Sequence, residues 1–189
     1  DYTIADADLD FLAEGETVDV IFTITVTDDF GATASQDVTI NITGSNDAPV
    51  ITAGVVSGTI TEGGPVSQTG SIGFTDLDLT NRPTATEATA SVTTTLSLTT
   101  AQQDAIEDAF IISPAGGNTN DGTINWDYTI ADADLDFLAA GETVDVIFTI
   151  TVTDDFGVTA RQDVTINITG SNDAPVSYTH LTLPTICSV

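Results

Sequence analysis

The chain has very few basic residues, and most residue types that carry covalent or catalytic chemistry are missing from it. The only cysteine is Cys187, the only histidine is His180, and lysine and methionine do not occur. Disulfide bonds between the elements before residue 177 are therefore excluded, and Lys–Asn isopeptide crosslinks are excluded because they need a lysine. Triads built on a histidine or lysine base are excluded from the same part of the chain. No apolar run of about 20 residues predicts a membrane-spanning helix.

Most of the charged residues are acidic. Twenty-nine Asp and Glu stand against two arginines, Arg82 and Arg161, which gives a formal net charge of −27. Apolar residues make up 41% of the chain and fall in regular alternation, so a folded polyanion is expected rather than a disordered one. Without basic patches the chain is expected to bind neither nucleic acid nor an anionic membrane. Hard cations are the natural neutralisers of clustered carboxylates.

A long internal repeat organises the sequence. Residues 1–50 return as residues 127–176, and three positions differ: Glu14 against Ala140, Ala32 against Val158, and Ser35 against Arg161. A repeat of this size is a domain-sized unit of a tandem array. Residues 51–176 are therefore predicted to form one complete repeat, and residues 1–50 the second half of a preceding one.

The hydrophobic pattern predicts an all-β fold. Apolar residues alternate with polar ones over 18–26 and again over 33–43, with a turn at 28–31, as expected for a hairpin. One helical signal is present: Thr100-Ala101-Gln102-Gln103 is read as a capping box, which predicts a single short helix near 101–110. Many short strands rich in Thr and Val, with one helix, indicate antiparallel β-sandwich repeats in tandem.

The last thirteen residues, 177–189, do not continue the repeat. Val50 is followed by Ile51-Thr52-Ala53, whereas its counterpart Val176 is followed by Ser177-Tyr178-Thr179-His180. The string VSYTHLTLPTICSV resembles a translated sequencing-library adapter, so this tail is expected to be non-native and disordered. True divergence of a following repeat is the alternative.

Strand direction predicts where the acidic residues gather. The acidic segment 6–16 and the linker 44–49 lie at one end of the hairpin, and the turn lies at the other. The equivalent turn at 154–157 then faces the preceding repeat, and Asp76 and Asp78 join it if the strand at 71–74 runs the same way. The expected junction collects Asp6, Asp8, Asp10, Glu14, Glu16, Asn46, Asp47, Asp76, Asp78, Asp154 and Asp155.

The chemistry of this junction favours calcium. Crowded carboxylates are tolerated when they are solvated, protonated or bound to metal. Oxygen ligands without His or Cys indicate Ca²⁺ rather than zinc or copper, and magnesium fits less well because it keeps its waters. Neither an EF-hand nor a nonapeptide Gly-Asp repeat is present. The alternative is that these acids are solvated loop residues that confer solubility.

The stretch from Gly122 to Val176, which contains GETVDVIFTITVTDDFG and ITGSNDAPV, resembles a VCBS repeat, a module of very large bacterial surface and secreted proteins. The resemblance covers residues 51–176 in full and 1–50 as a second half. More distantly the chain is similar to cadherin repeats. This implies Ig-like or cadherin-like sandwiches with calcium between successive domains.

The cadherin resemblance implies a ligand set. Asp76-Leu77-Asp78 matches the cadherin Asp-x-Asp, Asp154-Asp155-Phe156-Gly157 matches its Asp-x-Gly turn, and Asn46-Asp47 matches the centre of its linker. Glu62 matches the cadherin glutamate at the far end, beside Asn172 and Asp173. Gly44 and Ala48 depart from the pattern, since they stand near linker positions where a cadherin carries its first acid and its last Asn. This departure implies fewer ions or weaker sites.

Three functions are compatible with these residues. The favoured one is a non-catalytic structural or adhesive repeat of a secreted or surface-anchored bacterial protein, rigidified by Ca²⁺. Its partners would be neighbouring repeats and a host, biofilm or carbohydrate surface. The second is a carbohydrate- or ligand-binding accessory module of an extracellular enzyme, which needs exposed aromatics. Trp126 and Tyr128 could supply them, but their alternating face indicates core. A carboxylate-pair glycosidase is the third, and no pair of acids is marked out for it.

Overall fold

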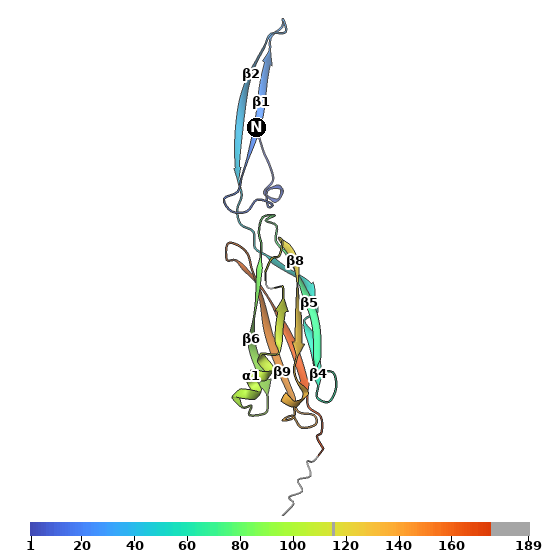
Figure 1. The fold of residues 1–189 in the computed structure, drawn as a ribbon. Helices are drawn as coiled ribbons and strands as arrows, with labels where there is room; N and C mark the ends of the chain where they lie inside the picture. The colour runs from blue at the N-terminus through green and yellow to red at the C-terminus, as the bar shows by residue number, and fades with distance from the viewer. Residues whose placement is uncertain (115, 175–189) are drawn as a thin grey trace, which may run out of the picture.

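The computed structural model describes residues 1–114 and 116–174, which form a two-layer β-sandwich with a two-stranded hairpin projecting from one end (Figure 1). The predicted tail at 177–189 lies outside the described residues. The elements in chain order are η1 (Asp6–Asp8), β1 (Thr17–Thr27), β2 (Thr33–Thr43), β3 (Val50–Gly54), β4 (Ser57–Thr61), β5 (Ser67–Thr75), β6 (Thr84–Thr94), α1 (Thr100–Glu107), β7 (Phe110–Ser113), β8 (Asp121–Thr129), η2 (Asp132–Asp134), β9 (Thr143–Thr153) and β10 (Thr159–Thr169).

Two four-stranded sheets face each other in the complete repeat. One has the order β4-β10-β9-β6 and the other β3-β5-β8-β7. The prediction of an all-β sandwich with one short helix is confirmed. One pair departs from the antiparallel rule, because β4 lies parallel to β10. The chain passes from β3 in one sheet to β4 in the other through Val55 and Val56, so β4 enters beside the last strand and runs in the same direction.

The core lies between the two sheets and follows the alternation of the sequence. Val144, Val146, Phe148, Ile150 and Val152 of β9 are all buried, and they face the buried residues of β5 and β8. Burial of such apolar side chains is the main favourable term in folding. The ring of Phe148 stacks on Phe110 with centroids 4.2 Å apart, and it lies tilted against Tyr128.

The helix begins and ends earlier than predicted. It spans Thr100–Glu107, and the capping box is formed by Thr99 and Gln102, one residue before the expected pair. Thr99 and Thr100 are adjacent and either could cap the helix; in the structure Thr99 is the cap. The helix ends before Phe110 because Phe110 joins β7, a strand missing from the sequence analysis, and is buried opposite Tyr128. Within the described residues, no helix is long and apolar enough to cross a membrane.

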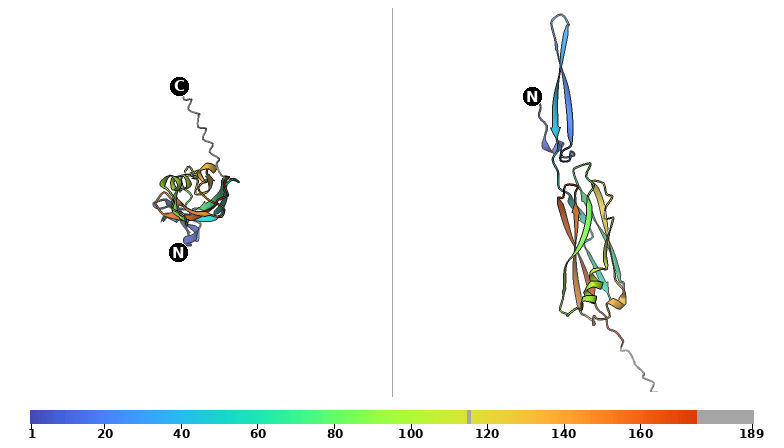
Figure 2. Two further views of the ribbon diagram at one scale, coloured as in Figure 1. Left: turned by 90° about the horizontal axis from the view of Figure 1, so that it is seen from below. Right: turned by 60° about the vertical axis from the view of Figure 1, so that its left-hand side comes forward.

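The N-terminal hairpin is made of β1 and β2, paired in full register from Thr17↔Thr43 to Thr27↔Thr33. At its tip Asp28 Oδ1 accepts hydrogen bonds from the amides of Phe30 and Ala32, and Gly31 has a φ of 87°. The turn after β9 is built in the same way, with Gly157 at the same φ. Figures 1 and 2 show the hairpin stacked end to end on the sandwich, so the two units are arranged along one line.

Candidate metal site at the junction between repeats

Three segments meet where the hairpin joins the sandwich: the linker after β2, the loop after β5 and the turn after β9. Both β5 and β9 run toward the hairpin, because Asp78 after β5 and Asp154 after β9 are hydrogen-bonded to the linker. Within the part of the chain that the structure describes, three hydrogen bonds cross the junction. Asn46 Nδ2 donates to Asp154 Oδ2 at 2.9 Å, the amide of Asp47 donates to Asp78 Oδ2 at 2.9 Å, and the amide of Leu79 donates to the carbonyl of Phe11 at 3.3 Å.

Three acidic side chains on the sandwich side of the junction are buried. Asp76, Asp78 and Asp154 are 4%, 0% and 6% exposed, and the neighbouring Asn81 is 1% exposed. The amide of Asp78 donates to Asp76 Oδ1 at 3.0 Å, and Asn81 Nδ2 donates to Asp78 Oδ2 at 3.0 Å. Buried ionised carboxylates are costly unless they are paired or bound to a metal ion. Simple solvation therefore does not account for these side chains.

Four buried oxygen atoms of this cluster have no hydrogen-bond partner among the described residues: Asn46 Oδ1, Asp76 Oδ2, Asp78 Oδ1 and Asn81 Oδ1. A buried acceptor without a hydrogen-bond partner is rare in native proteins, and it lowers the free energy of unfolding by about 1–3 kcal/mol. The guanidinium of Arg82 donates to the backbone carbonyls of Leu79 and Asn81. Because all four atoms without a partner are oxygens, they form a set of ligand atoms that fits a hard cation such as Ca²⁺.

The pKa values of three carboxyl groups are raised here. Burial is the largest cause in each case, and neighbouring negative charges add to it. The charges of Asp154 and Asp47 raise the pKa of Asp76, and those of Asp76, Asp47 and Asp154 raise the pKa of Asp78. Asp10 and Asp6, from the preceding unit, raise the pKa of Asp47. Acids from both units therefore act on one another across the junction.

These pKa shifts predict how stability depends on pH without metal. A carboxyl whose folded-state pKa lies above its usual 3.8 binds protons more tightly when folded, so the folded state gains stability as pH falls from 7 toward 3.8. We expect the metal-free chain to become more stable, relative to a variant with Asp76→Asn and Asp78→Asn, as the pH is lowered through this window. Chemical unfolding in EDTA at several pH values measures the difference. A relative stability that instead falls on acidification would contradict the prediction.

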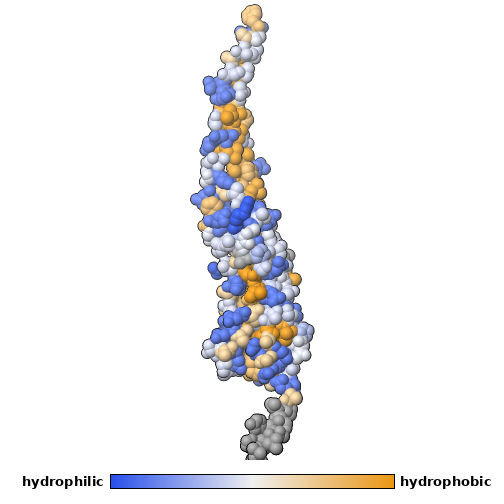
Figure 3. All heavy atoms as spheres, in the orientation of Figure 1, coloured by the Kyte–Doolittle hydropathy of each residue, from blue (hydrophilic) through white to orange (hydrophobic). Residues whose placement is uncertain are grey.

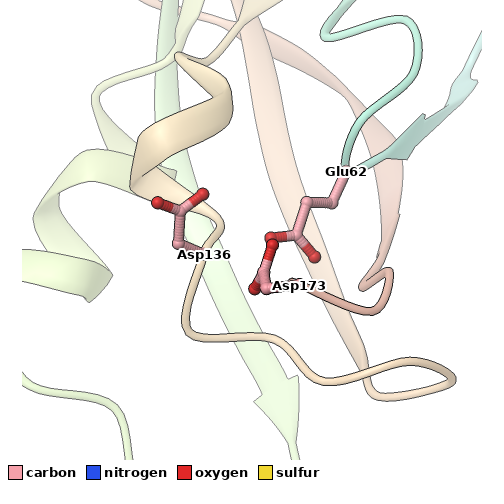
Figure 4. Close-up of side chains that lie close together, drawn as sticks. All are labelled: Glu62, Asp136 and Asp173. Atoms are coloured by element: carbon pink, nitrogen blue, oxygen red, sulfur yellow. The ribbon is translucent and has the colours of Figure 1, made fainter. Parts of the chain in front are cut away.

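A second acidic cluster lies at the opposite end of the complete repeat. Carboxylate oxygens of Glu62, Asp136 and Asp173 all lie within 4.8 Å of one another, and Figure 4 shows their side chains converging from three loops. Glu62 is buried; its Oε2 accepts from the amide of Ser171 at 2.7 Å, and its Oε1 has no partner among the described residues. By the offset of the repeat, Asp136 and Asp173 correspond to Asp10 and Asp47. The far end thus reproduces one half of the junction.

The other predicted residues have different partners. Glu16 Oε2 accepts a local hydrogen bond from the amide of Ala13, whereas Asp155 Oδ2 accepts a long-range one from the amide of Arg82. Asn172 donates to the carbonyl of its neighbour Asp173. Asp8 and Glu14 are exposed. At the junction itself, the predicted residues that contact one another or shift one another's pKa are Asp6, Asp10, Asn46, Asp47, Asp76, Asp78 and Asp154. Glu62 and Asp173 lie together in the second cluster.

Two residues of these clusters were missing from the sequence analysis. Asp136 could have been found, because it is the repeat counterpart of Asp10. Asn81 carries no comparable signal, since it lies in an irregular loop three residues after Asp78 and has no counterpart within residues 1–50. Its role follows from its burial and its bond to Asp78, which the tertiary structure creates.

The aromatic pair considered for sugar stacking is part of the core. Trp126 and Tyr128 are 1% and 0% exposed, which confirms the core interpretation. Trp126 Nε1 donates to the carbonyl of Val55 at 2.7 Å, and the Tyr128 hydroxyl donates to the carbonyl of Ile106 at 3.2 Å. Both polar tips are thus satisfied inside the protein, and neither ring is offered to a ligand.

No family model matches the chain, and no curated protein sequence matches it. Solved structures with similar strand arrangements include a PapD-like domain of human CEP192, with 10% identity and a TM-score of 0.40 over 68% of this chain and 89% of that one. The sialic acid binding region of a Streptococcus sanguinis adhesin matches with 17% identity and a TM-score of 0.39, over 79% of this chain and 37% of that one. Extracellular cadherin domains 1–5 of protocadherin gamma B2 match with 11% identity and a TM-score of 0.35, over 84% and 27%.

Proposed function

We propose that this chain is part of a non-catalytic structural array of VCBS-like repeats, in which Ca²⁺ bound between successive repeats holds them in line. The observation that carries the proposal is a set of four buried oxygen atoms that have no hydrogen-bond partner in the described part of the chain, three from the sandwich and one from the linker. An ion held by these residues would satisfy acceptors that the described residues leave free and would neutralise the crowded charge.

The residues that would hold the ion come from both units. Asp76, Asp78 and Asn81 belong to the sandwich, while Asn46 and Asp47 belong to the linker, and Asp10 adds charge from the preceding unit. Calcium takes about six to eight oxygen ligands, so a set divided between two units is complete when both are correctly aligned. Binding therefore favours the aligned arrangement over bent ones by mass action.

The wider role follows from the same arrangement. A rigid, strongly acidic rod without disulfides suits a spacer or adhesive stalk of a secreted or surface-anchored bacterial protein, with neighbouring repeats as its immediate partners. A carbohydrate- or ligand-binding accessory module of an extracellular enzyme is the second candidate. It is supported by a shallow groove of about 660 Å³ on the outer surface of β5, β8 and β7, lined by Thr69, Ser71, Ile111, Asn125 and Asp127 among others.

Small-angle X-ray scattering of the chain tests the stiffening directly. With calcium we expect one extended distribution of interatomic distances. With EDTA we expect a broader distribution and a shorter maximum dimension, because repulsion among the unneutralised carboxylates loosens the junction. The variant with Asp76→Asn and Asp78→Asn should give the same scattering with and without calcium.

A matched control separates site binding from general charge screening. Asp145 and Asp163 lie exposed on β9 and β10, so replacing both by asparagine removes the same two charges outside the junction. This control should keep the full response to calcium. An equal response to magnesium or to plain salt, or a response of the junction variant as large as that of the wild type, would show that the acids are merely screened and would refute the proposed role.

A further inference from the structure

The hairpin carries an apolar face that the described residues leave open. Phe22, Ile24, Val26 and Val38 are exposed to between 39% and 68%, and Figure 3 shows hydrophobic residues gathered along this unit. A groove of about 410 Å³ runs over the face, lined by Asp1, Tyr2, Phe22, Ile24, Val38 and Ile40. A contiguous apolar surface of this kind marks an interaction site.

The complete repeat shows what covers an identical face. The counterparts of the four exposed residues are Phe148, Ile150, Val152 and Val164, each at most 1% exposed. The three positions at which the copies differ are represented in the complete repeat by Ala140, Val158 and Arg161, all exposed, so the inward-facing side chains of the two copies are the same. The buried residues that cover the face come from segment 51–126: Ile60, Ile72, Phe74, Ala85, Ile106, Phe110, Ile124 and Trp126.

The edges of the hairpin match the same segment. In the complete repeat β10 pairs in parallel with β4, and β9 pairs antiparallel with β6. The corresponding edges of β2 and β1 have no partner strand within the described residues. An open strand edge presents unpaired amides and carbonyls and readily accepts another strand. The hairpin therefore offers a face and two edges, and each has its complement in residues 51–126.

One aromatic contact is already in place. Tyr2 and Phe22 lie 5.5 Å apart at an interplanar angle of 56°, close to the 6.0 Å and 50° of Tyr128 and Phe148. The other face of Phe148 is stacked on Phe110. Phe22 thus has the geometry of the core aromatic and lacks the phenylalanine that segment 51–126 would supply.

We propose that the apolar face of β1 and β2 is a docking surface for a polypeptide segment with the sequence of residues 51–126, which would complete a second sandwich. This inference goes beyond the cation site and does not depend on it. A second copy of the whole chain is a poorer occupant, because its own segment 51–126 is already covered by residues 127–176.

The test extends the full chain by a second copy of residues 51–126 placed directly before Asp1, which copies the Trp126–Asp127 connection of the sandwich. Hydrogen exchange followed by mass spectrometry then measures protection of β2. Peptides that contain Ala32 and Ser35 differ in mass from those with Val158 and Arg161, so the two repeats are distinguished. We expect amides of β2 to exchange at least about 100-fold more slowly in the extended chain than in the original chain, since core strands exchange through global opening.

Two substitutions in the extended chain probe the face itself. Phe22→Asp places a charge on the inward face and should abolish the gain in protection. Ile21→Asp adds the same charge to the adjacent residue on the other face and should retain it. No gain in the extended chain would overturn the proposal. Equal protection of β2 in the original chain, together with a dimeric mass in sedimentation, would also overturn it in favour of self-association.

Discussion

Replacing Phe148 by alanine is expected to lower the free energy of unfolding of the complete repeat by about 3–5 kcal/mol. Phe148 is 1% exposed and lies between Phe110 and Tyr128, so its removal leaves a cavity bounded by both sheets. The same substitution at Phe22, its repeat counterpart, is expected to change that free energy by at most about 0.5 kcal/mol, because Phe22 is 42% exposed and lies outside this core. The chain thus contains its own matched control.

Trp126 is the only tryptophan of the chain and is buried in the complete repeat, so its fluorescence during chemical unfolding reports that repeat. The midpoint should move strongly for Phe148→Ala and stay in place for Phe22→Ala. Similar losses for the two variants would mean that the hairpin and the sandwich share one core, contrary to the burial described above. Equal and small effects would mean that Phe148 is not packed between the sheets.

Calcium is expected to raise the thermal unfolding temperature of the complete repeat by roughly 10 °C when free calcium is about a hundredfold above its dissociation constant. Selective binding of calcium to the folded state then adds about 2.7 kcal/mol to the free energy of unfolding. The unfolding temperature of a domain of this size rises by a few degrees for each added kcal/mol. The physical reason is local: Asp76 and Asp78 are buried, each has one carboxylate oxygen without a hydrogen-bond partner among residues 1–114 and 116–174, and calcium would bind both.

The matched variants decide whether this shift belongs to the junction. Asp76→Asn with Asp78→Asn should abolish it, while Asp145→Asn with Asp163→Asn should preserve it. Without metal at pH 7 the junction variant should be at least as stable as the wild type, since the amides remove charges that repel one another. A calcium shift that survives in the junction variant would place the stabilising ion elsewhere, with the cluster of Glu62, Asp136 and Asp173 as the next site to test.

Much of the fold could be predicted because its signals are local. The alternation in β9 and the Asp-Asp-Phe-Gly turn specify a hairpin by themselves, and the structure has that hairpin twice. The predicted bounds of the helix were wrong because the local signals there were ambiguous or were outweighed by tertiary contacts. Thr99 and Thr100 both suit a helix cap, and Phe110 suits a helix face as well as a strand. Pairing with Tyr128 and burial against Phe148 decided in favour of the strand.

The sequence by itself determined the repeat, the β-sandwich class, the exclusion of disulfide and isopeptide crosslinks, and an all-oxygen set of candidate ligands. Strand direction even indicated the end at which Asp154 lies. Only the tertiary structure decided which acids are buried, which oxygens lack a partner, and that Asn81 and Asp136 belong with them. The same holds for the hairpin: Phe22 and Phe148 lie in identical local sequence, yet one is exposed and the other is core. Burial of a side chain depends on which other segments pack over it, and the local sequence pattern does not specify those segments.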